Sequence, residues 1–282
     1  MKKFVILIFM LSVSLLCNCK NQDNEKIVSI GGSTTVSPIL DEMILKYNKI
    51  NNNTKVTYDA QGSSVGINGL FNKIYKIAIS SRDLTKEEIE QGAKETVFAY
   101  DALIFITSPE IKITNITEEN LAKILNGKIQ NWKQVGGPDA KINFINRDSS
   151  SGSYSSIKDL LLNKIFKTHE ESQFRQDGIV VKSNGEVIEK TSLTPYSIGY
   201  IGLGYAKNSI EKGLNILSVN STYPTKETIN NNKYTIKRNL IIVTNNKYED
   251  KSITQFIDFM TSSTGQDIVE EQGFLGIKTY LN

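Results

Sequence analysis

The sequence repeats one unit several times: a short apolar run, then a loop of small polar residues, then an amphipathic helical pattern. The first three such loops are "GGSTTVSP" (31–38), "QGSSVG" (61–66) and the segment around Ser81, and a fourth, "NRDSSSGSYSS" (146–156), carries an arginine. Strands that alternate with helices in this way are typical of α/β domains. We therefore predict an α/β fold, with Ser37 before Pro38 as the N-cap of the first helix.

The loops are rich in hydroxyl groups and glycine and contain little charge. In open α/β sheets, ligands bind beyond the carboxyl ends of the strands, where helices begin. Helix N-termini attract anions, and serine and threonine add short donor side chains. Arg147 supplies a planar set of donors that matches two oxygens of a phosphate-like group. The loops together predict a dry site for a small tetrahedral anion.

The overall composition excludes some classes of partner. Hydrophobic residues make up 39% of the 282 residues and charged residues 22%, as in an ordinary soluble globular protein. The formal net charge is +3, and no basic patch is clustered in the sequence, so we expect no nucleic-acid partner.

The N-terminus is typical of a secreted protein. Lys2 and Lys3 precede the apolar run "FVILIFMLSVSLL", which is shorter than the ~20 residues of a membrane span. The segment Leu16–Cys19 resembles a bacterial lipobox, although Asn18 replaces the usual small residue. We expect a signal peptide at 1–18 and a lipidated tether at 19–25 with Cys19 as the lipidation site; a plain secretory signal is the alternative.

Two apolar runs are the expected connections between domains. They are "DALIFITSP", which ends at Pro109, and "RNLIIVTNN", which begins at Arg238. They divide the chain into one lobe of residues 26–107 plus 238–282 and an inserted lobe of residues 108–237.

Other chemistries have weaker signals. Ser155 and Lys158 fit the Ser-x-x-Lys motif of penicillin-binding proteins, but a Lys-Thr-Gly element is missing. His169 is the only histidine and lies in a polar segment, so we expect it to be solvated. With both cysteines near the N-terminus and no tight carboxylate cluster, we expect no metal site and no cofactor. Trp132 and the tyrosines Tyr196, Tyr200 and Tyr205 are expected to pack in the core.

Several segments together resemble the substrate-binding proteins of bacterial phosphate ABC importers. The loops "GSTTVSPI", "QGSSVGINGL" and "AISSRDLTKEE" are similar to the three anion loops of that family. The segments "INRDSSSGSY" and "TEENLAKILNGKIQNWKQVGG" are similar to its arginine loop and its tryptophan turn, and they are the more specific signals. The resemblance implies a type II periplasmic-binding-protein fold, with two lobes, a cleft between them and two crossover strands.

The resemblance also implies a set of phosphate-binding residues, carried over position by position. These residues are Thr34, Thr35, Ser63, Ser81, Arg147, Ser151, Gly152 and Ser153, with Ser33 and Ser64 as neighbours of lower rank. Some family members have an aspartate where this chain has Ser81, and that aspartate accepts the proton of hydrogen phosphate. Arg82 is either a second ligand or an ion-pair partner of Asp83 or Asp148, and the structural role is narrowly preferred.

The function implied by the resemblance is transport without catalysis. The chain is expected to be a monomeric, lipid-anchored extracytoplasmic receptor that captures inorganic phosphate. It would deliver the ion to the membrane subunits of an ABC importer. The alternatives are a receptor for sulfate or molybdate and, with less support, a Ser-x-x-Lys acyl-enzyme.

Overall fold

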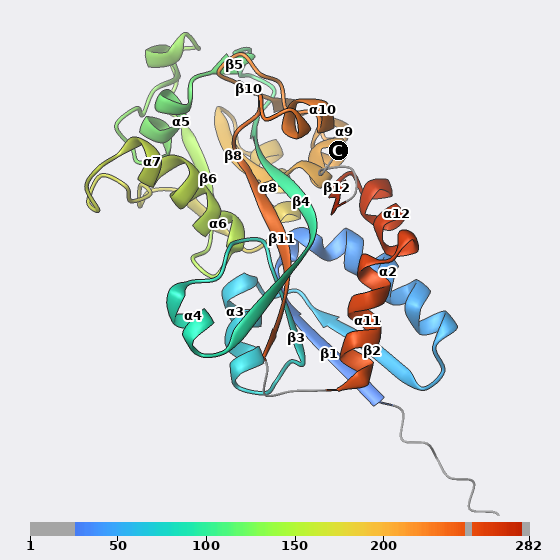
Figure 1. Ribbon diagram of the computed structural model, residues 1–282. Helices are drawn as coiled ribbons and strands as arrows, with labels where there is room; N and C mark the ends of the chain where they lie inside the picture. The colour runs from blue at the N-terminus through green and yellow to red at the C-terminus, as the bar shows by residue number, and fades with distance from the viewer. Residues whose placement is uncertain (1–25, 246–249, 278–282) are drawn as a thin grey trace, which may run out of the picture.

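The chain forms two lobes that lie one above the other in the ribbon view (Figure 1). The structure is a computed structural model that describes residues 26–245 and 250–277. Strands and helices alternate along most of this length, so the predicted α/β architecture is confirmed.

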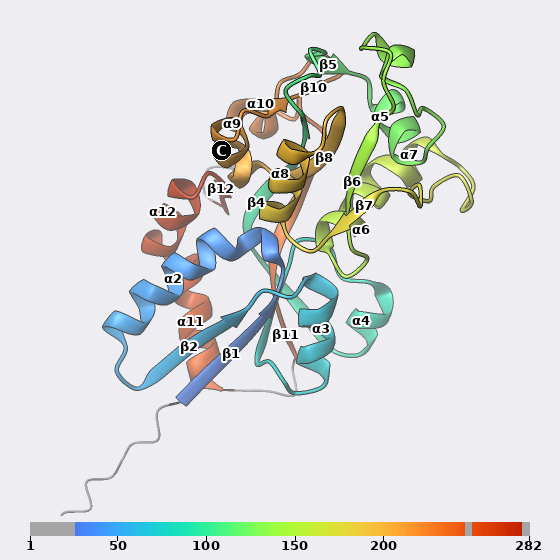
Figure 2. The same ribbon diagram turned by 180° about the vertical axis from the view of Figure 1, so that it is seen from behind.

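The first lobe is built on three parallel strands, β1 (Lys26–Gly32), β2 (Thr54–Asp59) and β3 (Ile77–Ser80), in the order β2-β1-β3. Its helices are α2 (Ser37–Ile50), α3 (Ser63–Phe71), α4 (Lys86–Glu90), α11 (Lys251–Thr261) and α12 (Ser263–Glu271). Helices α2 and α11 lie on one side of these strands and α3 on the other, as both ribbon views show (Figures 1 and 2).

Both faces of this sheet are apolar, because successive side chains of a strand point to opposite faces. In β3, Ile77 and Ile79 pack into the core shared with α2, α11 and α12. Between them, Ala78 points to the other face and packs with Ile67 and Leu70 of α3. The continuous apolar run of the strand therefore reflects burial on two sides.

Two long antiparallel strands, β4 (Ala93–Thr107) and β11 (Lys237–Asn245), connect the lobes. The first part of β4, up to Ala102, pairs with β11, and from Leu103 onward β4 pairs with β8 (Ser197–Gly202) of the second lobe. The Leu103 N–H donates a hydrogen bond of 2.9 Å to the carbonyl of Ile236, just before β11 begins. The chain therefore changes lobe at these paired positions.

The second lobe continues the sheet from β4 through β8 and β6 (Asn143–Arg147) to β7 (Ile179–Val181), and these last three strands are parallel. Its helices are α5 (Glu118–Leu125), α6 (Gly152–Ile157), α7 (Asn163–Ile165) and α8 (Asn184–Leu193). Smaller elements of this lobe are β5 (Asn115–Ile116), β9 (Asn215–Ile216), β10 (Ser218–Val219), α9 (Ala206–Glu211) and α10 (Lys226–Asn230). The short β12 (Leu275–Gly276) pairs with β4 at Ala99 and Tyr100, on the side of the first lobe.

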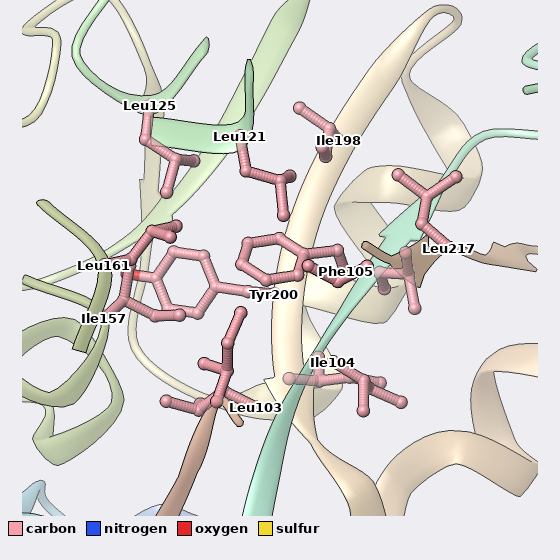
Figure 3. Close-up of a cluster of buried hydrophobic side chains, with 14 of the residues drawn as sticks. Leu103, Ile104, Phe105, Leu121, Leu125, Ile157, Leu161, Ile198, Tyr200 and Leu217 are labelled. Carbon is pink, nitrogen blue, oxygen red and sulfur yellow. The ribbon is translucent and has the colours of Figure 1, made fainter. Parts of the chain in front are cut away.

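The core of the second lobe surrounds Tyr200. In Figure 3, its ring lies among side chains from the helices on one side and from β4 and β8 on the other, including Ile157, Leu161 and Phe105. Trp132 is fully buried, and its indole Nε1 donates to the carbonyl of Tyr196 at 2.8 Å. Core packing is thus confirmed for Trp132 and Tyr200, whereas Tyr196 is 37% exposed and was placed wrongly.

The structure corrects one predicted helix start and shows an irregular turn in another helix. The first helix does not begin with Ser37 as its N-cap, because a 3-10 turn of Thr34–Val36 precedes α2 and Ser33 caps that turn. After α6 the helix widens into a π-turn, Lys158–Leu162, before α7. Such single π-turns are frequent at functional sites.

The predictions for the N-terminus lie outside the described residues. These are the signal peptide at 1–18, the tether at 19–25 and lipidation at Cys19. Within residues 26–245 and 250–277, no helix is both long enough and apolar enough to cross a bilayer.

Candidate functional site

The polar loops of both lobes converge at the edge where the lobes meet. The parallel strands β1 and β3 end at Gly32 and Ser80, and each is followed directly by the polar loop predicted from the sequence. In the second lobe, β6 ends at Arg147. Because the carboxyl ends of parallel strands share one edge of a sheet, these loops come together across the gap between the lobes.

Arg147 is the most unusual residue at this edge. Its side chain is 1% exposed, and its Nη2 donates to Thr34 Oγ1 at 3.0 Å and to the Lys182 carbonyl at 2.6 Å. Its Nε and Nη1 have no hydrogen-bond partner in the structure. Burial lowers the pKa of this guanidinium, although arginine still carries its charge. Unpaired donors on a buried cation are costly, so one of these nitrogens, together with the adjacent Nη2, is suited to a pair of anion oxygens.

Asp148 does not neutralise this charge by direct contact. Its carboxylate accepts hydrogen bonds from the backbone N–H of Ser150 and from the Ser150 hydroxyl. No ion pair joins Asp148 to Arg147 in the part of the chain that the structure describes. The arginine therefore keeps a positive charge available to a ligand.

The serines of the first lobe form a connected group of hydroxyls. Ser33 Oγ donates to Ser81 Oγ at 2.8 Å, and Ser63 Oγ lies 3.4 Å from the same atom. Ser63 Oγ also accepts from the Ser81 backbone N–H at 3.1 Å. All three side chains are almost fully buried. The structure thus brings together residues from three separate loops, as predicted.

Two tyrosines hold the backbone of the first loop in place. Tyr205 from the second lobe donates to the Thr34 carbonyl at 3.0 Å, and Tyr58 from β2 donates to the Ser33 carbonyl. Burial raises the pKa of both phenols, so both remain protonated donors at neutral pH. Tyr205 had been expected only to pack in the core, and it contacts the site as well.

Gly152 lies in close contact with the first lobe. A Cβ atom added there would lie 2.3 Å from Ser63 Oγ and 2.4 Å from Ser81 Oγ, which leaves no room for a side chain. Two hydrogen bonds flank this contact: Ser156 Oγ donates to the Ser81 carbonyl at 2.9 Å, and the Ser64 N–H donates to the Ser150 carbonyl at 3.1 Å. The lobes are therefore in direct contact at the predicted site.

Ser151 and Ser153 have different roles. The Ser151 hydroxyl caps α6 by accepting from the backbone N–H groups of Ser153 and Tyr154. Ser153 Oγ is fully buried and lies 3.4 Å from Thr35 Oγ1, across the lobe boundary. The hydroxyls of Thr35 and Ser153 thus face each other, whereas that of Ser151 is used mainly within its own loop.

The site also contains a buried ion pair that the sequence analysis missed. Arg238 of β11 contacts Asp101 of β4 at 2.8 Å, and it also donates to Ser153 Oγ and Thr35 Oγ1. Both residues had been read only as part of the apolar connecting runs. A signal was present, because a charged residue inside an apolar strand is rarely fully buried without a partner.

The role of Arg82 was only partly anticipated. Its guanidinium forms two hydrogen bonds with Glu88, at 2.7 and 2.9 Å, and it also donates to Ser64 Oγ. The expected ion-pair partners, Asp83 and Asp148, are therefore wrong. Glu88 is the capping-box residue of α4, and its position in the first helical turn aims its carboxylate back at residues 82 and 85.

An 850 Å³ pocket opens beside the hydroxyl cluster. Its lining comes from both lobes and the connecting strands and includes Ser64, Arg82, Tyr154, Lys158 and Arg238. Arg147 and Thr34 do not line it. The lobes are therefore separated here, while they are in contact at Gly152.

The residues of the competing hypotheses are hydrogen-bonded to other groups. Ser155 Oγ donates to the Ser151 carbonyl and Lys158 Nζ donates to Gln173, so the Ser-x-x-Lys pair is not hydrogen-bonded. His169 is exposed and contacts Gln173. Among residues 26–245 and 250–277, no three side chains of the metal-binding types are grouped closely enough to hold an ion.

Comparison with known proteins agrees with this geometry. The profile of the PBP superfamily domain matches residues 20–264. The phosphate-binding protein PstS of Borreliella burgdorferi is 96% identical over 279 residues, which cover 99% of this chain and 100% of that protein.

Solved structures show the same fold. The crystal structure of PstS from Borrelia burgdorferi, 96% identical, aligns over 89% of this chain and 99% of its own with a TM-score of 0.61. A Clostridium perfringens protein solved with bound phosphate, 28% identical, aligns over 89% of this chain and 100% of its own with a TM-score of 0.82. The chain therefore belongs to the PBP superfamily and, within it, to the family of the phosphate-binding protein PstS.

Proposed function

We propose that this chain is an extracytoplasmic receptor that captures inorganic phosphate between its lobes and delivers it to the membrane subunits of an ABC importer. The observation that carries the proposal is the buried Arg147, which has two unpartnered nitrogens beside a cluster of hydroxyls. Membership in the PstS family supports the same conclusion. The proposed function involves no chemical reaction.

The proposed ligands come from both sides of the cleft. In the first lobe they are Thr34, Thr35, Ser63 and Ser81, and in the second they are Arg147, Ser151, Gly152 and Ser153. Hydrogen bonds to a charged group contribute about 1.5–3 kcal/mol each. Several such bonds, less the cost of immobilising the ion, reach about −8 kcal/mol, which corresponds to a micromolar dissociation constant.

We further propose that the lobes, residues 26–107 plus 238–282 and residues 108–237, close around the ion by a hinge motion. Support comes from β4, whose strand pairing changes from β11 to β8 after Ala102. The 96% identical crystal structure superposes less well than a 28% identical one, as expected if the lobes of one sequence can take different relative positions.

The test is calorimetry with phosphate and with sulfate on residues 20–282. We expect phosphate to bind with a micromolar or lower dissociation constant, because Arg147 offers two free donors. Sulfate is the informative competitor, since Ser81 stands where some relatives have a proton-accepting aspartate. Equal affinity for both ions would replace the phosphate assignment by that of a general oxyanion receptor. Absence of binding by either ion would refute the proposal.

We also propose that the mature protein is a monomer anchored by a lipid on Cys19. The support is the sequence around Leu16–Cys19, which resembles a lipobox and is followed by a polar tether. Cells fed a labelled fatty acid should label the wild-type protein, and the Cys19→Ser variant should carry no label and should leave the membrane fraction. Equal labelling of both proteins would contradict the assignment.

A further inference from the structure

The buried ion pair between Arg238 and Asp101 lies near the start of β11, next to the positions where the connecting strands change lobe. The two residues are directly opposite each other in the β4–β11 register. Arg238 Nη2 and Nε lie 2.8 and 3.1 Å from Asp101 Oδ2. The other carboxylate oxygen, Oδ1, accepts from the Leu203 N–H at 2.9 Å. Asp101 is fully buried, so this pairing fixes the orientation of the guanidinium.

The remaining N–H groups of Arg238 point at residues of the candidate site from both lobes. Nη1 donates to the Ser81 carbonyl at 3.1 Å and to Ser153 Oγ at 2.9 Å. Nη2 donates to Thr35 Oγ1 at 3.2 Å. One side chain on the connecting strands therefore contacts the first lobe, through Thr35 and Ser81, and the second lobe, through Ser153.

These contacts determine the direction of the hydroxyl hydrogens. A guanidinium has donors only, whereas a hydroxyl has one hydrogen and two lone pairs. The hydroxyl oxygens of Thr35 and Ser153 must therefore accept from Arg238, and their own hydrogens must point elsewhere. Only one of the two can donate to the other across the 3.4 Å that separates them. At least one hydrogen is left for a ligand.

The hydroxyls of the first lobe follow the same pattern with other donors. Ser81 Oγ accepts from Ser33 Oγ, and Ser63 Oγ accepts from the Ser81 N–H. Thr34 Oγ1 accepts from Arg147. Each of these oxygens receives a donor. Only one of Ser63 and Ser81 can donate to the other across the 3.4 Å between them, so at least one of their two hydrogens stays available. A cluster of this kind matches the unprotonated oxygens of a bound phosphate ion.

We propose that Arg238, oriented by Asp101, is a positioning residue that fixes the hydroxyls of Ser153 and Thr35 as hydrogen-bond donors to the bound anion. This inference rests on the proposed function. Arg238 need not touch the anion itself, because its charge is neutralised by Asp101. Its contribution is to remove the alternative in which these hydroxyls turn and present lone pairs to the ion.

The test is a double-mutant cycle measured by phosphate calorimetry. In the wild-type background, Ser153→Ala should raise the dissociation constant about 10-fold or more, because one hydrogen bond to the ion is lost. In the Arg238→Lys background, Ser153→Ala should raise the dissociation constant less than about 3-fold. Lysine keeps the charge but lacks the planar set of donors, so the Ser153 hydroxyl is no longer held in place. The control is Thr34→Val. The hydroxyl of Thr34 is oriented by Arg147, so its removal should raise the dissociation constant by the same factor in both backgrounds.

The outcomes separate the inference from the function on which it rests. Equal losses for Ser153→Ala in the two backgrounds would overturn the role of Arg238 while leaving phosphate binding intact. A wild-type protein that does not bind phosphate would refute the proposed function itself. If Arg238→Lys does not fold, judged by thermal unfolding, the pair Asp101→Asn with Arg238→Met replaces it in the same cycle. The two substituted side chains carry no charge, and the side-chain oxygen of the introduced asparagine can still accept from the Leu203 N–H.

Discussion

Arg147→Ala is expected to raise the dissociation constant for phosphate by a factor of about 10²–10⁴. Two donor nitrogens, Nε and Nη1, lie buried without a partner, and one of them, together with the adjacent Nη2, is proposed to hold two oxygens of the ion. Two charge-assisted hydrogen bonds contribute about 3–6 kcal/mol, which gives this range. Calorimetry on the variant and the wild-type protein measures the loss directly.

The matched control for this variant is Ser155→Ala. Ser155 lies on the same helix as the proposed ligands, but its hydroxyl donates only to the Ser151 carbonyl at 3.5 Å. Its removal should change the affinity less than about 2-fold, since surface changes away from key contacts have small effects. An Arg147→Ala protein that is folded by circular dichroism and binds phosphate as the wild type does would end the assignment of Arg147.

Gly152→Ala is expected to raise the dissociation constant for phosphate by about 10- to 100-fold. Overpacking a dense contact usually costs about 1–3 kcal/mol, which corresponds to a change of about this size. The added methyl group would lie 2.3–2.4 Å from the hydroxyl oxygens of Ser63 and Ser81. The lobes would then be held apart at the point where the proposed ligands meet. Calorimetry measures the affinity, and small-angle scattering with phosphate present should show a less compact protein.

Gly185→Ala in α8 is the matched control for the glycine variant. A Cβ at position 185 would have Ser183 Oγ at 3.9 Å as its only near neighbour. Alanine also favours helix over glycine, so this variant should be at least as stable as the wild type and bind equally well. If Gly152→Ala binds phosphate as tightly as Gly185→Ala does, close contact at Gly152 is not required for binding.

The sequence was sufficient to predict the parts of the site that depend on local patterns. Strands followed by loops of serine, threonine and glycine placed Thr34, Ser63 and Ser81 at one sheet edge, and the structure brings these loops together. Arg147 was predicted from its position after an apolar run, and it lies there buried. Their proposed contacts with an ion stay predictions.

The parts that were missed depend on contacts between distant residues. Arg238 and Asp101 are 137 positions apart, and their pairing follows from the register of β4 and β11, which no local pattern reveals. The partner of Arg82 was misjudged because the choice among nearby acidic residues depends on where the first turn of α4 points. Long-range register and side-chain direction are set by tertiary packing.

A crystal structure of residues 20–282 grown with saturating phosphate tests the proposed anion site most directly. One phosphate ion should lie between the lobes, with two of its oxygens within about 3 Å of Arg147, one at Nη2 and one at Nε or Nη1, the usual length of such hydrogen bonds. The hydroxyls of Thr34, Ser63 and Ser153 should surround the same ion. A structure in which phosphate binds elsewhere, while Nε and Nη1 of Arg147 both still lack a partner, would refute this site.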